Sequence, residues 1–150
     1  MCIRDSIYAD TKVIAKIELK SAVKNLKSII QESDGVMVAR GDLGVQLPLE
    51  RIPLVQKEIL NETNLQGKIT ITATEMLTSM ISSHRPTRAE VSDITNAILD
   101  GTDAVMLSAE TSIGENPIEV VGAMAKICSE VDSVSGTKTV SYTHLTLPTT

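Results

Sequence analysis

Short apolar runs alternate with longer amphipathic segments along most of this chain. Each run is five residues long and rich in aliphatic residues, which is typical of a buried β-strand. The runs span residues 13–17, 35–39, 69–73 and 103–107. Apolar residues at the spacing of one helix face fill the segments 20–33, 52–67, 87–101 and 117–131. The pattern therefore predicts strands and helices in alternation.

This alternation predicts βα units around a parallel sheet, and so an α/β fold. The chain has no Phe and no Trp, so aliphatic side chains and Met must build the core, which suits buried parallel strands. Four units fit half of a (β/α)₈ TIM-type barrel or a small doubly wound sheet. Two helix ends are marked: Gly67 stands where a C-terminal glycine belongs, and Thr87 with Glu90 forms a capping-box pair.

Composition narrows the class of protein. The formal charge of −5 at pH 7 argues against a nucleic-acid partner. Cys2 and Cys128 do not suggest a disulfide framework, and no apolar run is long enough to span a bilayer. With no signal-peptide pattern either, we expect a cytoplasmic chain without a membrane partner. We expect one domain over residues 7–132, a non-native leader over 1–6, and a linker with a non-native tail over 133–150.

Polar residues follow each predicted strand. The carboxyl ends of parallel strands lie on one side of a sheet, and that side carries the active site in α/β folds. Lys16 and Glu18 are two positions apart, so they point to the same face of an extended strand. We expect a loop after the second strand, and Asp42 stands in it between two glycines. Thr74 follows the third strand. We therefore expect these four residues to lie close together.

Each of these residues also has a simpler interpretation. Lys16 and Glu18 could form a local ion pair, Asp42 could belong to an ordinary turn, and Thr74 could cap a helix. An Arg-Gly-Asp adhesion motif at residues 40–42 conflicts with the apolar strand that runs directly into it. Taken together, however, two carboxylates are typical of a Mg²⁺ site completed by water and substrate oxygens, and the ammonium group suits an anionic substrate.

In this order, the segments resemble pyruvate kinase. The resemblance rests on VIAKIE (13–18), SDGVMVARGDLGVQLP (33–48), TATEMLTSM (72–80) and RPTRAEVSDITNAILDGTDAVMLSAET (85–111), followed by a helix that begins with proline. It covers roughly residues 8–132. It implies strands five to eight of the family's catalytic (β/α)₈ domain, and therefore the half barrel rather than the doubly wound sheet.

The resemblance implies roles for five residues. Lys16 is the expected catalytic residue, which binds the substrate and stabilises charge on the transferring phosphoryl group and the enolate oxygen. Glu18 and Asp42 are the expected ligands of Mg²⁺ or Mn²⁺. The backbone at Gly41 and Asp42 is expected to receive the carboxylate of phosphoenolpyruvate or pyruvate, and Thr74 to contact the substrate near the carbon that is protonated.

For the whole protein, the resemblance implies phosphoryl transfer from phosphoenolpyruvate to ADP, which yields pyruvate and ATP in glycolysis. It also implies a homotetramer that uses K⁺, with the K⁺ ligands outside this chain, and a subunit contact near Arg85 and Arg88. Leu19, Glu75 and Ala109 depart from the residues usual in the family. Because the first half of the barrel is missing, we expect the fragment alone to be inactive or nearly so.

Two other functions stay open at this point. A metal-dependent pyruvate-enolate lyase on a related barrel would use a similar carboxylate pair but would not need ADP. A non-catalytic binding fragment would keep the fold without the chemistry. The ordered segments of the resemblance favour the kinase over both.

Overall fold

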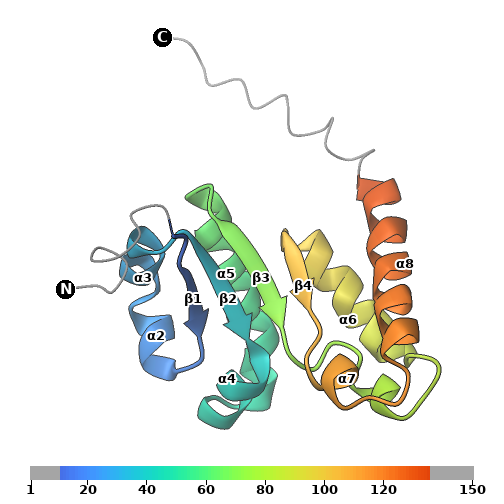
Figure 1. The fold of residues 1–150 in the computed structure, drawn as a ribbon. Coiled ribbons are helices and arrows are strands. Elements are labelled where there is room, and N and C mark those ends of the chain that lie inside the picture. The colour runs from blue at the N-terminus through green and yellow to red at the C-terminus, as the bar shows by residue number, and fades with distance from the viewer. Residues whose placement is uncertain (1–10, 136–150) are drawn as a thin grey trace. The chain divides into compact units, whose positions relative to one another are not determined.

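A computed structural model describes residues 11–135 and shows a four-stranded parallel sheet with helices (Figure 1). The expected leader, residues 1–6, lies outside the described residues, as do residues 136–150 of the expected tail. The described residues form two compact units. The first contains residues 11–76 and 100–108, and the second contains residues 77–99 and 109–135.

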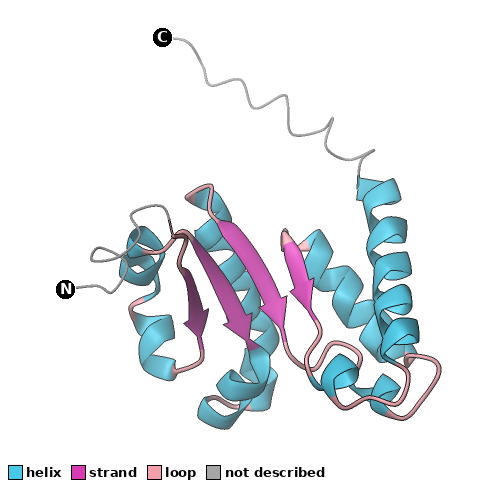
Figure 2. Cartoon of the chain, viewed as in Figure 1, coloured by secondary structure: helices cyan, strands magenta, loops and turns pink. Residues whose placement is uncertain are grey.

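The sheet belongs to the first unit, and its arrows all run in the same direction (Figure 2). Its strands are β1 (Ile14–Ile17), β2 (Gly35–Ala39), β3 (Ile69–Ala73) and β4 (Ala104–Met106), close to the predicted runs. They pair in parallel in the order β1-β2-β3-β4. A doubly wound sheet reverses its strand order at a switch point, whereas this order does not reverse. The α/β fold with a parallel sheet is thus confirmed, and its strand order is that of a barrel rather than of a doubly wound sheet.

Helices α3 (Leu26–Glu32) and α5 (Ile52–Leu65) bury the core of the first unit. The segment 20–33 was predicted as one helix, but α2 (Lys20–Lys24) ends before Asn25 and α3 begins after it. The Asn25 side chain donates to the Ser21 carbonyl oxygen at 2.9 Å, which offers the backbone an alternative to the helical ladder. The buried core includes Ile17, Val36, Val38, Ile30, Ile59 and Leu60.

The glycine-containing segment after β2 was predicted as a loop, and that prediction was wrong. It forms helix α4 (Arg40–Gln46), followed by the 3₁₀ helix η1 (Leu49–Arg51). Gly41 and Gly44 lower the helix propensity of this segment. The completely buried Leu43 belongs to the core cluster of the unit, so tertiary packing outweighs the propensity. Gly67 behaves as predicted, with a φ of 64° just beyond α5.

The second unit is helical and contains η2 (Thr78–Ile81), α6 (Arg88–Leu99), α7 (Ala109–Ser112) and α8 (Pro117–Ser135). Helix α8 packs against α6 and α7. It continues to Ser135, so residues 133–135 of the expected linker are helical. The side chain of Glu110 is 2% exposed and accepts the Leu77 N–H at 3.2 Å. None of the helices within residues 11–135 is long and apolar enough to cross a membrane.

The predicted capping box at the start of α6 is present. The Glu90 carboxylate accepts the Thr87 N–H at 2.7 Å, and the Glu90 N–H donates to the Thr87 hydroxyl at 3.2 Å. The same carboxylate also accepts the N–H and the hydroxyl of Ser79. Burial favours the protonated form of Glu90, but the hydrogen bonds from Ser79 and Thr87 together outweigh it and hold the pKa of Glu90 below 4.5.

Replacing Glu90 by Gln should therefore weaken this helix start at neutral pH. We expect the free energy of local opening, measured by hydrogen exchange at the Ser79 and Thr87 amides, to fall by about 1 kcal/mol. The carboxylate stabilises only while ionised, so the difference from the wild type should persist above pH 4.5 and vanish as the pH falls through the lower folded-state pKa. Glu130→Gln, an exposed position on α8, is the control. A loss that does not depend on pH would contradict this account.

Candidate active site

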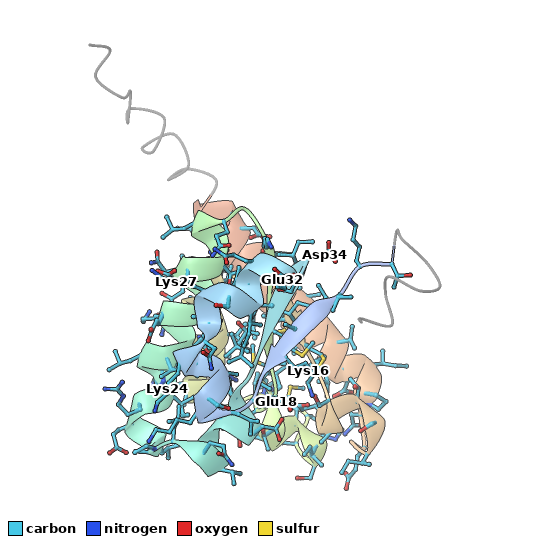
Figure 3. All side chains as sticks on the ribbon, turned by 90° about the vertical axis from the view of Figure 1, so that its left-hand side faces the viewer. Lys16, Glu18, Lys24, Lys27, Glu32 and Asp34 are labelled. Carbon is cyan, nitrogen blue, oxygen red and sulfur yellow. The ribbon has the colours of Figure 1, made fainter. Side chains whose placement is uncertain are left out.

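Lys16 and Glu18 lie at the carboxyl end of β1, as predicted. The buried Ile17 between them points into the core, so the alternation of an extended strand directs both neighbours to the other side. The Lys16 ammonium group forms an ion pair with the Glu18 carboxylate. Figure 3 shows this pair at one end of the strand, whereas Glu32 and Asp34 lie at the opposite end. The Lys16 side chain is 54% exposed and accessible to a ligand.

Two carboxylates act on the Lys16 ammonium group. The hydrogen bond to Glu18 and the negative charge of Glu18 raise the pKa of Lys16 above 10.5. Desolvation opposes this increase, and the negative charge of Asp42 adds a smaller contribution in the same direction. Asp42 is exposed in the first turn of α4, directly after the neighbouring strand β2. The charges of Lys16, Glu18 and Asp42 are thus coupled, and the ammonium group stays protonated at neutral pH.

Gly41 and Thr74 are in direct contact. The Gly41 N–H donates to the Thr74 hydroxyl oxygen at 2.8 Å, and that hydroxyl donates to the Ala73 carbonyl oxygen at 2.6 Å. A Cβ atom at position 41 would lie 3.4 Å from the Thr74 hydroxyl oxygen, an ordinary van der Waals contact, so this approach does not itself require glycine. Thr74 does not cap a helix, because the residues after it form a turn and η2 begins only at Thr78. The ends of β2 and β3 are therefore linked through these two residues.

Arg40 is a residue whose role the sequence did not reveal. It is 6% exposed, and its guanidinium group donates to the carbonyl oxygens of Thr74 and Glu75. Both acceptors have left-handed backbone conformations, with φ values of 68° at Thr74 and 54° at Glu75. These are uncommon for residues other than glycine, and most of all for a β-branched threonine. The feature of the sequence that could have indicated this role is a charged arginine placed directly after an entirely apolar strand.

The donors that could hold a metal are the two carboxylates of Glu18 and Asp42. Within residues 11–135, no group of three or more His, Cys, Asp or Glu side chains gathers as a metal site. A pair of carboxylates is the protein contribution that Mg²⁺ commonly receives, with water and substrate oxygens completing its coordination. Carboxylate oxygens also suit Mn²⁺. Both acidic groups act on the Lys16 ammonium group, and carboxylate oxygens are chemically suited to a divalent metal.

Comparisons with known proteins agree with one another. A family model described as "Pyruvate kinase, barrel domain" matches residues 3–121. Pyruvate kinase 2 from Synechocystis sp. is 58% identical over 120 residues, which are 80% of this chain and 20% of that protein. Pyruvate kinase from Clostridium perfringens is 54% identical over 124 residues, 83% of this chain and 26% of that protein.

The solved structures give the same result. A pyruvate kinase from Cryptosporidium parvum superposes with a TM-score of 0.83 at 49% sequence identity, over 86% of this chain and 26% of that one. The chain spans about a fifth to a quarter of the length of the relatives it matches.

Proposed function

Because the chain belongs to the pyruvate kinase barrel-domain family, we propose that it is one half of a catalytic barrel that transfers the phosphoryl group of phosphoenolpyruvate to ADP. The products are pyruvate and ATP. The observation that carries this proposal is the coupling of Lys16 to Glu18 and Asp42 at the ends of two adjacent strands. Phosphoryl transfer needs positioned charges more than covalent help from the protein, and these residues supply both signs of charge.

Lys16 is the proposed catalytic residue. Its ammonium group is exposed and protonated, so it can bind the phosphoryl group and stabilise the negative charge that develops on the enolate oxygen. The two nearby carboxylates keep the proton on Lys16, because both raise its pKa. Lys16 thus acts as a fixed positive charge rather than as a proton donor in the transfer step.

Glu18 and Asp42 are the proposed metal ligands. Together with Lys16, these two side chains carry a net charge of −1. A bound divalent metal would reverse that sign and polarise the enolate oxygen. Gly41, Asp42 and Thr74 are proposed to bind the substrate: the backbone at Gly41 and Asp42 receives the carboxylate, and Thr74 lies near the carbon that is protonated.

The remaining features concern the whole protein. We propose a homotetramer in the cytoplasm, with K⁺ as a second cation whose ligands lie outside this chain. The negative charge of the chain, −5 at pH 7, supports the expectation that nucleic acid is not a partner. Arg85, in the segment before α6, and Arg88, the first residue of α6, are proposed to lie near a subunit contact.

A graft tests the proposal. Residues 11–132 of this chain would replace the matching segment of the Clostridium perfringens pyruvate kinase, and this protein is called the grafted enzyme below. We expect pyruvate formation from phosphoenolpyruvate that requires both ADP and Mg²⁺. Pyruvate released without ADP by cleavage of a carbon–carbon bond in a 2-oxo acid, rather than from phosphoenolpyruvate, would favour the enolate lyase. A folded graft that binds neither phosphoenolpyruvate nor oxalate, a mimic of the enolate, would favour a non-catalytic role.

The metal ligands give a separate prediction. In the grafted enzyme, Glu18→Gln and Asp42→Asn should each raise the Mg²⁺ concentration for half-maximal activity by more than about tenfold, because each removes one of two ionic ligands. A Mg²⁺ titration at saturating substrate measures the shift. Glu32→Gln removes an exposed carboxylate at the opposite end of β1 (Figure 3) and should leave the titration unchanged. Equal effects of all three substitutions would count against the assigned ligands.

A further inference from the structure

We propose that Arg40 is a positioning residue, whose guanidinium group holds the Thr74–Glu75 turn in its left-handed conformation and so keeps the Thr74 hydroxyl against the Gly41 N–H. This inference rests on the proposed function, because it assigns to Arg40 the placement of groups that are proposed to bind the substrate. Arg40 itself need not touch the substrate, since its side chain is 6% exposed.

The contacts of Arg40 converge on one short stretch of backbone. Its Nε and Nη2 atoms donate to the Thr74 carbonyl oxygen at 3.1 and 2.8 Å, and Nη2 also donates to the Glu75 carbonyl oxygen at 2.7 Å. Nη2 further contacts the Met76 sulfur. The guanidinium plane therefore binds two successive carbonyl groups of a turn that lies 34 residues away in the sequence.

The turn needs such support because its conformation is unfavourable. Thr74 and Glu75 have φ values of 68° and 54°, and each left-handed residue other than glycine costs on the order of 1 kcal/mol or more. A strained turn persists only where the surrounding structure determines it. The hydrogen bonds from Arg40 are charge-assisted, which makes them stronger than neutral ones. Because these hydrogen bonds are charge-assisted and end on the two strained residues themselves, they can offset the strain of the turn.

The turn, once held by Arg40, positions groups of the candidate site at the ends of both β2 and β3. The Thr74 hydroxyl oxygen lies 2.8 Å from the Gly41 nitrogen, and Gly41 follows Arg40 directly in the sequence. One residue thus connects the first turn of α4 to the end of β3 through its side chain, while its own backbone leads into Gly41. Arginine suits this role because its rigid planar fork presents the Nε and Nη2 donors side by side to the Thr74 carbonyl oxygen, whereas a lysine ammonium group is a single point charge on a flexible stem.

The test uses the grafted enzyme with Arg40→Lys and Arg40→Met. Relaxation of the turn should raise the KM for phosphoenolpyruvate and the Kd for oxalate with Mg²⁺ by about 10- to 100-fold, the range expected for lost charged hydrogen bonds. Arg40→Lys keeps the buried charge and serves as the variant to measure if Arg40→Met does not fold. Wild-type binding by a folded Arg40→Lys enzyme would overturn the proposal.

Lys68 offers a matched control, because its ammonium group also donates to backbone carbonyl oxygens, those of Ile30, Gln31 and Ser33. It precedes β3 and so lies at the opposite end of the strand from Thr74. Lys68→Met should lower the urea midpoint without changing the Kd for oxalate. If Arg40→Lys changes the midpoint and the Kd only as Lys68→Met does, Arg40 is merely structural and the proposal fails.

A double-mutant cycle with Thr74→Val separates positioning from direct binding. If Arg40 acts through the Thr74 hydroxyl, Arg40→Lys should change the Kd for oxalate less than about twofold in the Thr74→Val background. Fully additive losses would contradict the proposal. Failure of the unsubstituted grafted enzyme to form pyruvate would instead refute the proposed function, so the two failures are distinguishable.

Discussion

Replacing Lys16 by Met in the grafted enzyme is expected to lower kcat by about 10²- to 10³-fold, the usual cost of removing one preorganised charge from a transition state. Unlike the buried Arg40 guanidinium group after β2, the Lys16 ammonium group is an exposed cation at the end of β1. Its effect should appear in kcat more than in the KM for phosphoenolpyruvate, because charge on the enolate oxygen develops only during transfer. Steady-state assays with varied phosphoenolpyruvate measure both quantities.

The expected loss of kcat should come from the missing charge of Lys16, because methionine has a similar bulk. Lys24→Met removes an exposed lysine on α2 and should leave kcat unchanged. Glu18→Gln should return the pKa of Lys16 toward 10.5, because the hydrogen bond to Glu18 and its charge are the main reasons for the raised value. An enzyme that keeps near wild-type kcat after Lys16→Met would require another residue to stabilise the transferring group.

The parts of the fold that sequence reasoning predicted correctly have local causes. Five-residue aliphatic runs determine the strands, and the Thr87–Glu90 capping box determines the start of α6. The shared face of Lys16 and Glu18 follows from strand alternation, and the structure shows the ion pair that was the simpler interpretation of these two residues. Each of these features depends on residues within a few positions of one another, which a single sequence displays directly.

The parts that were missed depend on distant residues. Nothing near Arg40 in the sequence indicates that its acceptors are the carbonyl groups of Thr74 and Glu75, 34 and 35 positions away. Threonine is also among the residues least expected to have a positive φ, so local preference argues against the observed turn. Helix α4 was missed for the same reason, because buried Leu43 offsets the low propensity of its two glycines. Tertiary contacts thus determine the finer geometry of the candidate site.

The isolated 150-residue chain is expected to turn over phosphoenolpyruvate and ADP more than about 10³-fold more slowly than the grafted enzyme, because positioning supplies much of the rate in this chemistry. The chain spans about a fifth to a quarter of its relatives. Among the described residues, β1 pairs only with β2, and β4 pairs only with β3. Each of these edge strands has one side without a strand partner, and such edges promote association.

Two measurements check this expectation. An ADP-dependent pyruvate assay compares the turnover of the isolated chain with that of the grafted enzyme. Because the grafted enzyme contains residues 11–132 unchanged, a lower turnover of the isolated chain cannot be caused by the residues of this segment. Size-exclusion chromatography at rising concentration should show the isolated chain forming larger species, as edge-to-edge pairing predicts. A monomeric chain with turnover within about tenfold of the grafted enzyme would mean that the ends of these four strands suffice to position both substrates. The remaining three quarters of the relatives would then contribute regulation and stability rather than the chemistry of transfer.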